Sequence, residues 1–177
     1  MSKTTWALDP THSELQFKVK HLMITTVTGN FKSFSATVET EGENFDTAKI
    51  EFSAEVSSID SGNEQRDGHL KSADFFEAEK FSTITFASTK LEKKDEENYL
   101  LHGDLTIKGI TKPISISTEF GGIAKDPWGN IKAGFTLNGK INRKDWELNW
   151  NASLEAGGVL VSEEVKIIAE IQVVKQA

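Results

Sequence analysis

Residues 48–57 read AKIEFSAEVS, and their alternation of apolar and polar side chains decides the fold class. Successive side chains of a β-strand point to opposite faces, so this stretch is a half-buried strand. Its inward row is Ala48, Ile50, Phe52, Ala54 and Val56. The same alternation recurs on both sides of this strand, which predicts a protein built mostly of antiparallel sheet.

Further alternating rows flank this strand along most of the chain. They occupy residues 14–21, 84–86, 99–107, 114–120, 131–141 and 165–173. Residues 27–41 change parity between Phe31 and Phe34, and a bulge at Lys32 and Ser33 would reconcile the two halves. Connections are short except at 60–76 and 142–163. This all-β pattern predicts an eight-stranded up-and-down antiparallel barrel, with a two-sheet sandwich as the alternative.

The stretch 60–76, DSGNEQRDGHLKSADFF, fits no strand and predicts one short helix at about 62–76, packed on the barrel. Ser61 and Glu64 have the spacing of a capping box. Helical spacing places Arg66 and His69 on one face and leaves Asp67 to pair with Lys71. Arg66 either extends to solvent at the edge of the helix or holds an anionic head group.

Length and composition favour one domain over residues 1–177. The chain has no Cys, which excludes disulfides and thiolate metal sites. Its net charge of −7 argues against nucleic-acid or anionic-membrane partners. The sequence contains no run of about 18 apolar residues, which is the length needed to span a bilayer. The start, MSKTTWALDP, lacks the apolar core of a signal peptide, so we expect a cytoplasmic protein, or a periplasmic or secreted one if a signal has been removed.

The inward rows leave open whether the barrel is packed solid or holds a ligand. Small residues interrupt each apolar row and would either open room for an apolar guest or fill the taper of a packed barrel. These small residues are Ala36, Ala48, Ala54, Gly103, Thr118, Ala133 and Ala169.

Two histidines near the N-terminus could suggest a metal pair, but the odd spacing of His12 and His21 separates them on a strand. His21 ends an inward row, either as a polar group at the barrel mouth or as a capped strand end. Asp145 beside Arg143 fits a turn pair. No nucleophile–base set and no catalytic sequence motif is visible.

Several motifs resemble the YceI family of polyisoprenoid-binding, lipocalin-like proteins, in order from about Trp6 to Val174. They are WALDPTHSELQFKVKH (6–21), NEQRDGHLKSADFF (63–76) followed by STITFAS (82–88), HGDLTIKGITKPI (102–114), INRKDWELNWN (141–151) and GGVLVSEEVKI (157–167). Two positions depart from the family pattern. Ser82 stands where proline is usual, and Glu147 stands where glycine is frequent.

The resemblance implies an extended eight-stranded barrel that binds a long isoprenoid or similar lipid without enzymatic activity or a cofactor, and a homodimer. From the resemblance and the residue patterns together, we predict that the ligand-binding residues are Phe17, Val19, His21, Phe31, Phe52, Arg66, His69, Phe75, Phe86, Leu101, Leu105, Ile116, Ala133, Phe135 and Leu137. The alternatives are an enzyme that uses His21 or His69 as acid–base and a packed barrel that serves only protein contacts.

Overall fold

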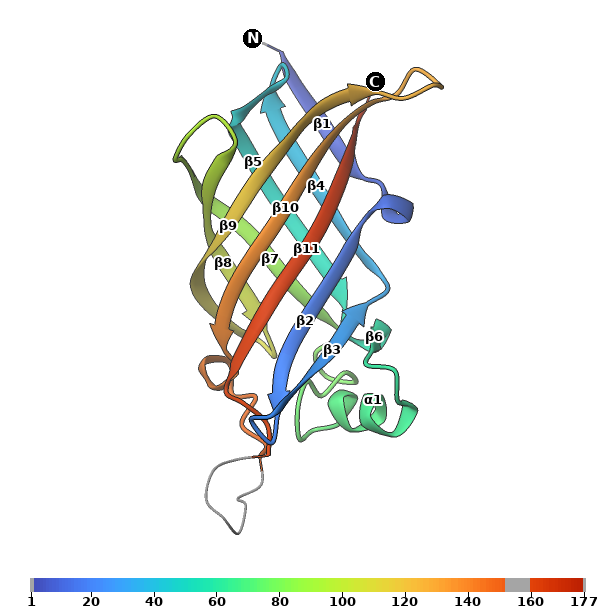
Figure 1. Ribbon diagram of the computed structural model, residues 1–177, viewed down its shortest axis with the longest axis vertical. Helices are drawn as coiled ribbons and strands as arrows, with labels where there is room; N and C mark the ends of the chain where they lie inside the picture. The colour runs from blue at the N-terminus through green and yellow to red at the C-terminus, as the bar shows by residue number, and fades with distance from the viewer. Residues whose placement is uncertain (1, 152–159, 177) are drawn as a thin grey trace.

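The alternating rows close into an antiparallel barrel of eight strands with one short α-helix, as predicted (Figure 1). The computed structural model describes residues 2–151 and 160–176. Its strands are β1 (Lys3–Leu8), β2 (Glu14–His21), β3 (Thr25–Phe31), β4 (Phe34–Glu41), β5 (Asn44–Glu55), β6 (Ile59–Asp60), β7 (Thr83–Lys93), β8 (Asn98–Ile107), β9 (Ile110–Lys125), β10 (Ile131–Asn142) and β11 (Glu164–Lys175). Its helices are α1 (Glu64–Lys71) and three short 3-10 turns, η1 (Pro10–His12), η2 (Val56–Ser58) and η3 (Arg143–Trp146).

Three of the eight barrel strands are interrupted, which is why the strand labels run to β11. β1 and β2 lie end to end along β11, separated by the turn at Pro10. β3 and β4 pair with β2 and β1 and are separated at Lys32 and Ser33, where the parity change predicted a bulge. β6 continues β5 past η2 and pairs with β3. Pairing of β1 with β11 closes the ring.

The first strand, β1, was not predicted, although it is essential for closure. Its sequence, KTTWAL, places on the inward face only Leu8 and one aromatic side chain, too few apolar residues for a visible alternation. That side chain, Trp6, is fully buried and donates from Nε1 to Oγ1 of Thr40 at 2.9 Å. Burial of a tryptophan with its N–H satisfied fixes the N-terminal strand against its neighbour β4.

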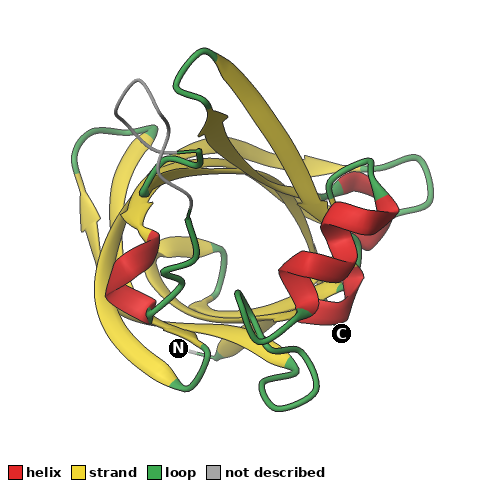
Figure 2. Ribbon diagram, turned by 90° about the horizontal axis from the view of Figure 1, so that it is seen from below, coloured by secondary structure: helices red, strands yellow, loops and turns green. Residues whose placement is uncertain are grey.

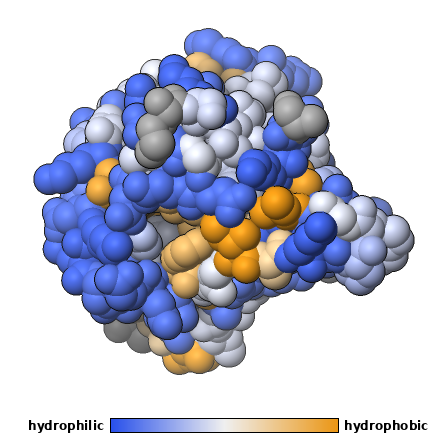
Figure 3. Space-filling view, turned by 90° about the horizontal axis from the view of Figure 1, so that it is seen from above, coloured by the Kyte–Doolittle hydropathy of each residue, from blue (hydrophilic) through white to orange (hydrophobic). Residues whose placement is uncertain are grey.

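The barrel end that carries the chain termini is filled by aromatic rings. Phe45 lies 4.8 Å from Trp6 and 5.1 Å from Phe135, between ring centroids, and Phe120 lies 5.3 Å from both Phe45 and Phe135. These rings come from strands on opposite sides of the ring of strands, so they pack across the lumen. Seen from outside, hydrophobic side chains gather inside a mostly hydrophilic rim (Figure 3).

Helix α1 lies at the opposite end and is shorter than predicted (Figure 2). Asn63, not Ser61, caps its N-terminus by accepting from the backbone N–H of Arg66 at 3.0 Å. The helix ends at Lys71 with Ser72 as its C-cap, and the rest of the predicted helix, up to Phe76, forms hydrogen-bonded turns. Asp67 accepts from the backbone N–H of Ser61 at 2.8 Å instead of pairing with Lys71. No helix in the described residues is long and apolar enough to cross a membrane.

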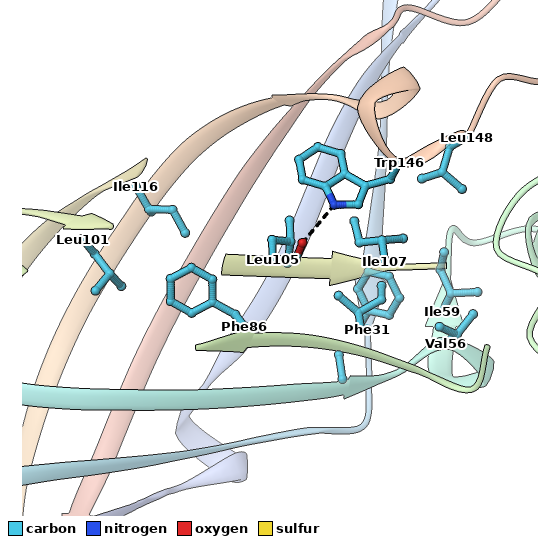
Figure 4. Packing of buried hydrophobic residues seen from close by; sticks show 12 residues of the cluster. Phe31, Val56, Ile59, Phe86, Leu101, Leu105, Ile107, Ile116, Trp146 and Leu148 are labelled. Carbon is cyan, nitrogen blue, oxygen red and sulfur yellow. Dashed lines mark hydrogen bonds between the residues drawn. The ribbon is translucent and has the colours of Figure 1, made fainter. Parts of the chain in front are cut away.

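The predicted loop 142–163 begins with η3, and its residues 152–159 lie outside the described part of the chain. Trp146 of η3 is buried in a cluster near the α1 end and donates from Nε1 to the carbonyl of Leu105 at 2.9 Å (Figure 4). Glu147 follows with φ of 59°. Glycine adopts this left-handed conformation without strain, whereas Glu147 adopts it at a cost to folding.

Gly103 does not open space in the lumen, contrary to the sequence expectation. A Cβ on Gly103 would lie 2.3 Å from Cζ of Phe86 and 2.6 Å from the carbonyl oxygen of Ala87. We expect Gly103→Ala to lower the free energy of unfolding by about 1–3 kcal/mol through overpacking. Gly68→Ala in α1 is the control, because nothing lies within 4 Å of a Cβ added to Gly68. This substitution should raise the free energy of unfolding by about 0.5–1 kcal/mol. Urea denaturation measures both, and equal effects would contradict this explanation.

Acid should weaken a charge cluster that fixes the turn between β1 and β2. Asp9 accepts from Nζ of Lys132 and is bonded to Nδ1 of His12, both at 2.8 Å. The Lys132 bond, ahead of the His12 bond, holds the pKa of Asp9 well below its usual range. Because the pKa of Asp9 is lower in the folded state than in the unfolded state, ionised Asp9 stabilises the fold above about pH 4. This contribution is lost as the pH falls below about 4. In Lys132→Met, the decrease in the free energy of unfolding between neutral and acidic pH should be smaller by about 1–2 kcal/mol, as measured by urea denaturation at several pH values. The same decrease in the variant and the parent would contradict this explanation.

Candidate ligand-binding cavity

A cavity of about 710 Å³ runs along the inside of the barrel. It extends from Val38, Phe45 and Val173 at the end with the chain termini to Arg66 and His69 of α1. Its volume falls within the range of small-molecule binding sites, about 300–1,000 Å³. The lumen is therefore hollow between the two ends and is not packed solid.

All the predicted ligand-binding residues except Ala133 line this cavity. Ala133 is 2% exposed and packs with Trp6, Val38, Phe45 and Val173 beyond the end of the cavity. The residues of β10 that face the lumen were predicted correctly, but Ala133, near the start of the strand, belongs to the packed end of the barrel. Of the other small residues on the inward rows, those that line the cavity are Ala36, Ala48, Ala54, Thr118 and Ala169.

The wall of the deep part of the cavity is apolar. Phe52, Phe86, Leu101 and other aliphatic and aromatic side chains line it. Its polar groups have partners in the protein. The hydroxyl of Tyr99 donates to Asp46 at 2.6 Å, and burial, ahead of this bond, raises the pKa of Tyr99 to about 12. Among the described residues, the deep part of the cavity thus offers no unpaired polar group to a guest, and contact with the wall is hydrophobic.

Helix α1 places Arg66 at the mouth of the cavity, where its side chain is hydrogen-bonded to Ser61, the residue that follows β6. Its Nε donates to Oγ of Ser61 at 2.8 Å, and its Nη2 donates to the Ser61 carbonyl at 2.6 Å. Ser61 in turn donates to Asp67. This network fixes Arg66 on the cavity wall and explains why the three residues occur together in the sequence.

An aromatic group joins the helix region to the segment after η3. The His69 ring meets Trp150 edge-on at 4.7 Å and Phe75 at 5.1 Å between centroids. Its Nε2 is bonded to Asp74 at 2.8 Å. His69 therefore has a structural role at the rim, where it holds two segments together over the mouth.

Arg143 lines the cavity, whereas its sequence neighbours indicate only a turn pair with Asp145. It is 3% exposed, and its guanidinium donates to four backbone carbonyls, those of Leu148, Trp150, Val161 and Ser162. Burial lowers the pKa of Arg143, but an arginine stays charged in proteins. The inward row 131–141 has odd parity, and extending it by one step to residue 143 would have found this side chain.

Arg143 forms no ion pair within the described residues, because Glu163 pairs instead with Lys144 at 2.8 Å. Together with Lys20 and Arg66, it makes the mouth the basic part of a cavity whose depth is apolar. His21 also lines the mouth and bridges to Val161 across the rim. His12 lies in η1 with Asp9, away from the cavity.

No group of three or more potential metal ligands is present in the described part of the chain. The YceI-like domain family matches residues 6–173, nearly the whole barrel.

The chain belongs to the YceI-like family.

Relatives of the YceI-like chain include UPF0312 protein SA2479 of Staphylococcus aureus, 41% identical over 170 residues that cover 96% of each chain. The crystal structure of a Campylobacter jejuni YceI protein is 35% identical, covers 90% of this chain and 91% of that one, and superposes with a TM-score of 0.78. A polyisoprenoid binding domain from Saccharophagus degradans is 15% identical, with coverage of 97% and 98% and a TM-score of 0.72. At that identity, the likeness shows the shared fold alone.

Proposed function

We propose that the protein binds a long isoprenoid-type lipid, with the tail in the cavity and the head group at the mouth, and so sequesters or carries it. The observation that carries this proposal is the polarity gradient of the cavity, which is apolar in depth and basic beside α1. Transfer of a hydrocarbon tail from water to this wall is favourable by about 25 cal/mol per Å² buried. The Saccharophagus degradans domain, described as polyisoprenoid binding, shares the fold that encloses this cavity.

The mouth favours an anionic head group, such as that of a polyprenyl phosphate, over an uncharged quinone. Arg143 is buried and charged, and its hydrogen-bond partners among residues 2–151 and 160–176 are all carbonyls; Arg66 lies on the same wall. A guanidinium binds phosphate oxygens through charge-assisted hydrogen bonds. An enzymatic role for His69 has less support, since its contacts with Asp74 and Trp150 already account for its position.

Extraction of the purified protein with organic solvent, followed by mass spectrometry, tests this proposal. We expect a co-purified isoprenoid-type lipid and an increase in melting temperature when polyprenyl phosphate is added. The increase should exceed that from an isoprenoid quinone with a tail of the same length. If no lipid is recovered and neither compound stabilises the protein, the proposal is wrong. The homodimer and the cytoplasmic location stay predictions.

A further inference from the structure

Exposed large hydrophobic side chains occur at both ends of the barrel. Met23 is 57% exposed and Ile24 is 76% exposed, both in the connection between β2 and β3 at the cavity mouth. At the other end, Ile123 and Trp128 are 38% and 83% exposed. The two pairs have similar chemistry, but they lie at opposite ends of the barrel, and the connection between β2 and β3 is at the end that carries α1 (Figure 1).

The connection between β2 and β3 is a tight turn with an unfavourable choice of residues. The backbone N–H of Ile24 donates to the carbonyl of His21 at 3.1 Å. The two central residues, Leu22 and Met23, have φ of 54° and 59°. Such a hairpin turn favours asparagine and glycine at these positions, because other residues are strained in the left-handed region. The chain thus carries apolar side chains here at a cost to folding, which points to a role in binding.

This turn is part of the rim of the cavity. The residue before it, His21, lines the cavity and bridges to Val161. The backbone N–H of Leu22 donates to the carbonyl of Leu160, another lining residue, at 2.8 Å. Whatever the turn contacts is therefore next to the entrance.

We propose that Met23 and Ile24 dock the protein on a lipid bilayer, with the cavity mouth facing the membrane from which the lipid enters. This inference rests on the proposed function, because a bilayer is where a long-chain lipid resides in water. Two side chains are far too few for a stable protein interface, which needs about 1,000 Å² or more. They suit shallow insertion into the boundary between head groups and acyl chains. With a net charge of −7, docking relies on apolar contact and favours a zwitterionic surface over an anionic one.

Flotation with phosphatidylcholine vesicles tests the docking surface. The double variant M23S/I24S should bind vesicles at least tenfold more weakly, and it should take up a fluorescent isoprenoid from vesicles correspondingly more slowly. Its uptake of the same isoprenoid from detergent solution should not change. The matched control, I123S/W128S at the closed end, should behave like the parent protein in all three assays, and raised salt should not release the parent protein from the vesicles.

The outcomes separate the two proposals. If M23S/I24S binds vesicles and takes up isoprenoid from them as well as the parent protein does, the docking surface is not this turn. The same conclusion follows if I123S/W128S loses as much vesicle binding as M23S/I24S. If the parent protein takes up no isoprenoid even from detergent, the proposed function itself fails, and the docking inference fails with it. Circular dichroism confirms that both variants are folded, as expected for exposed positions.

Discussion

Replacing Ala36 with tryptophan should abolish uptake of long lipids while the barrel stays folded. Ala36 lies in the middle of β4 with its side chain on the cavity wall. An indole at this position would occupy the lumen between the mouth and the aromatic cluster, so a tail could no longer extend along it. We expect affinity for a long isoprenoid to fall at least tenfold, about 1.4 kcal/mol or more. Titration with a fluorescent isoprenoid measures this loss.

The matched control for this variant is the next residue along the strand. Thr37 is exposed on the outer face of β4, so Thr37→Trp adds the same side chain outside the lumen. It should leave lipid affinity unchanged. A second comparison uses a short isoprenoid, which should still enter Ala36→Trp from the mouth. Equal affinity of Ala36→Trp and Thr37→Trp for the long lipid would show that the tail does not occupy this part of the barrel.

Arg143→Met should cause the largest loss of stability. Removal of the guanidinium leaves the carbonyls of Leu148, Trp150, Val161 and Ser162 without their donor at a buried site. Hydrogen bonds to a charged donor contribute about 1.5–3 kcal/mol each, and solvent can re-enter to replace some of them. We expect the free energy of unfolding to fall by about 3–5 kcal/mol in urea denaturation.

Lys144→Met is the control for Arg143→Met, because it removes a neighbouring cation whose ion pair with Glu163 is on the surface. Its cost should stay below about 1 kcal/mol. Arg143→Lys should be intermediate, since a single ammonium cannot reach all four carbonyls. If Arg143→Met costs no more than Lys144→Met, the guanidinium does not organise the segment after η3.

The period of two predicted the barrel because it reports directly which side chains face the lumen. It located most strands and the interruption at Lys32 and Ser33. It missed β1, a six-residue strand in which Trp6 is the one fully buried side chain. The predicted helix extends to Phe76 because residues 60–76 fit no strand, whereas backbone hydrogen bonds to the carbonyls of Leu70 and Ser72 turn the chain at residues 73–76. Such bonds leave no periodic signal in the sequence.

The site was predictable where it depends on parity and not where it depends on tertiary contacts. The cavity residues of β2, β5 and β8 follow from their inward rows. Ala133 has the same parity but lies beyond the cavity, because the rings of Phe45 and Phe135 close that end. The role of Arg143 could not be predicted because its four acceptors lie in the stretch 142–163, which has no periodic pattern. These acceptors are the carbonyls of Leu148, Trp150, Val161 and Ser162.

Photo-crosslinking tests most directly whether the lipid tail occupies the lumen. A long isoprenoid phosphate with a photoreactive group near the end of its tail would be bound, irradiated and mapped by peptide mass spectrometry. We expect crosslinks at deep wall residues such as Phe52, Phe86 and Leu101. A probe with the group beside the phosphate should instead label the mouth near Arg66. Tail crosslinks confined to outward-facing residues such as Thr37 would contradict binding inside the barrel.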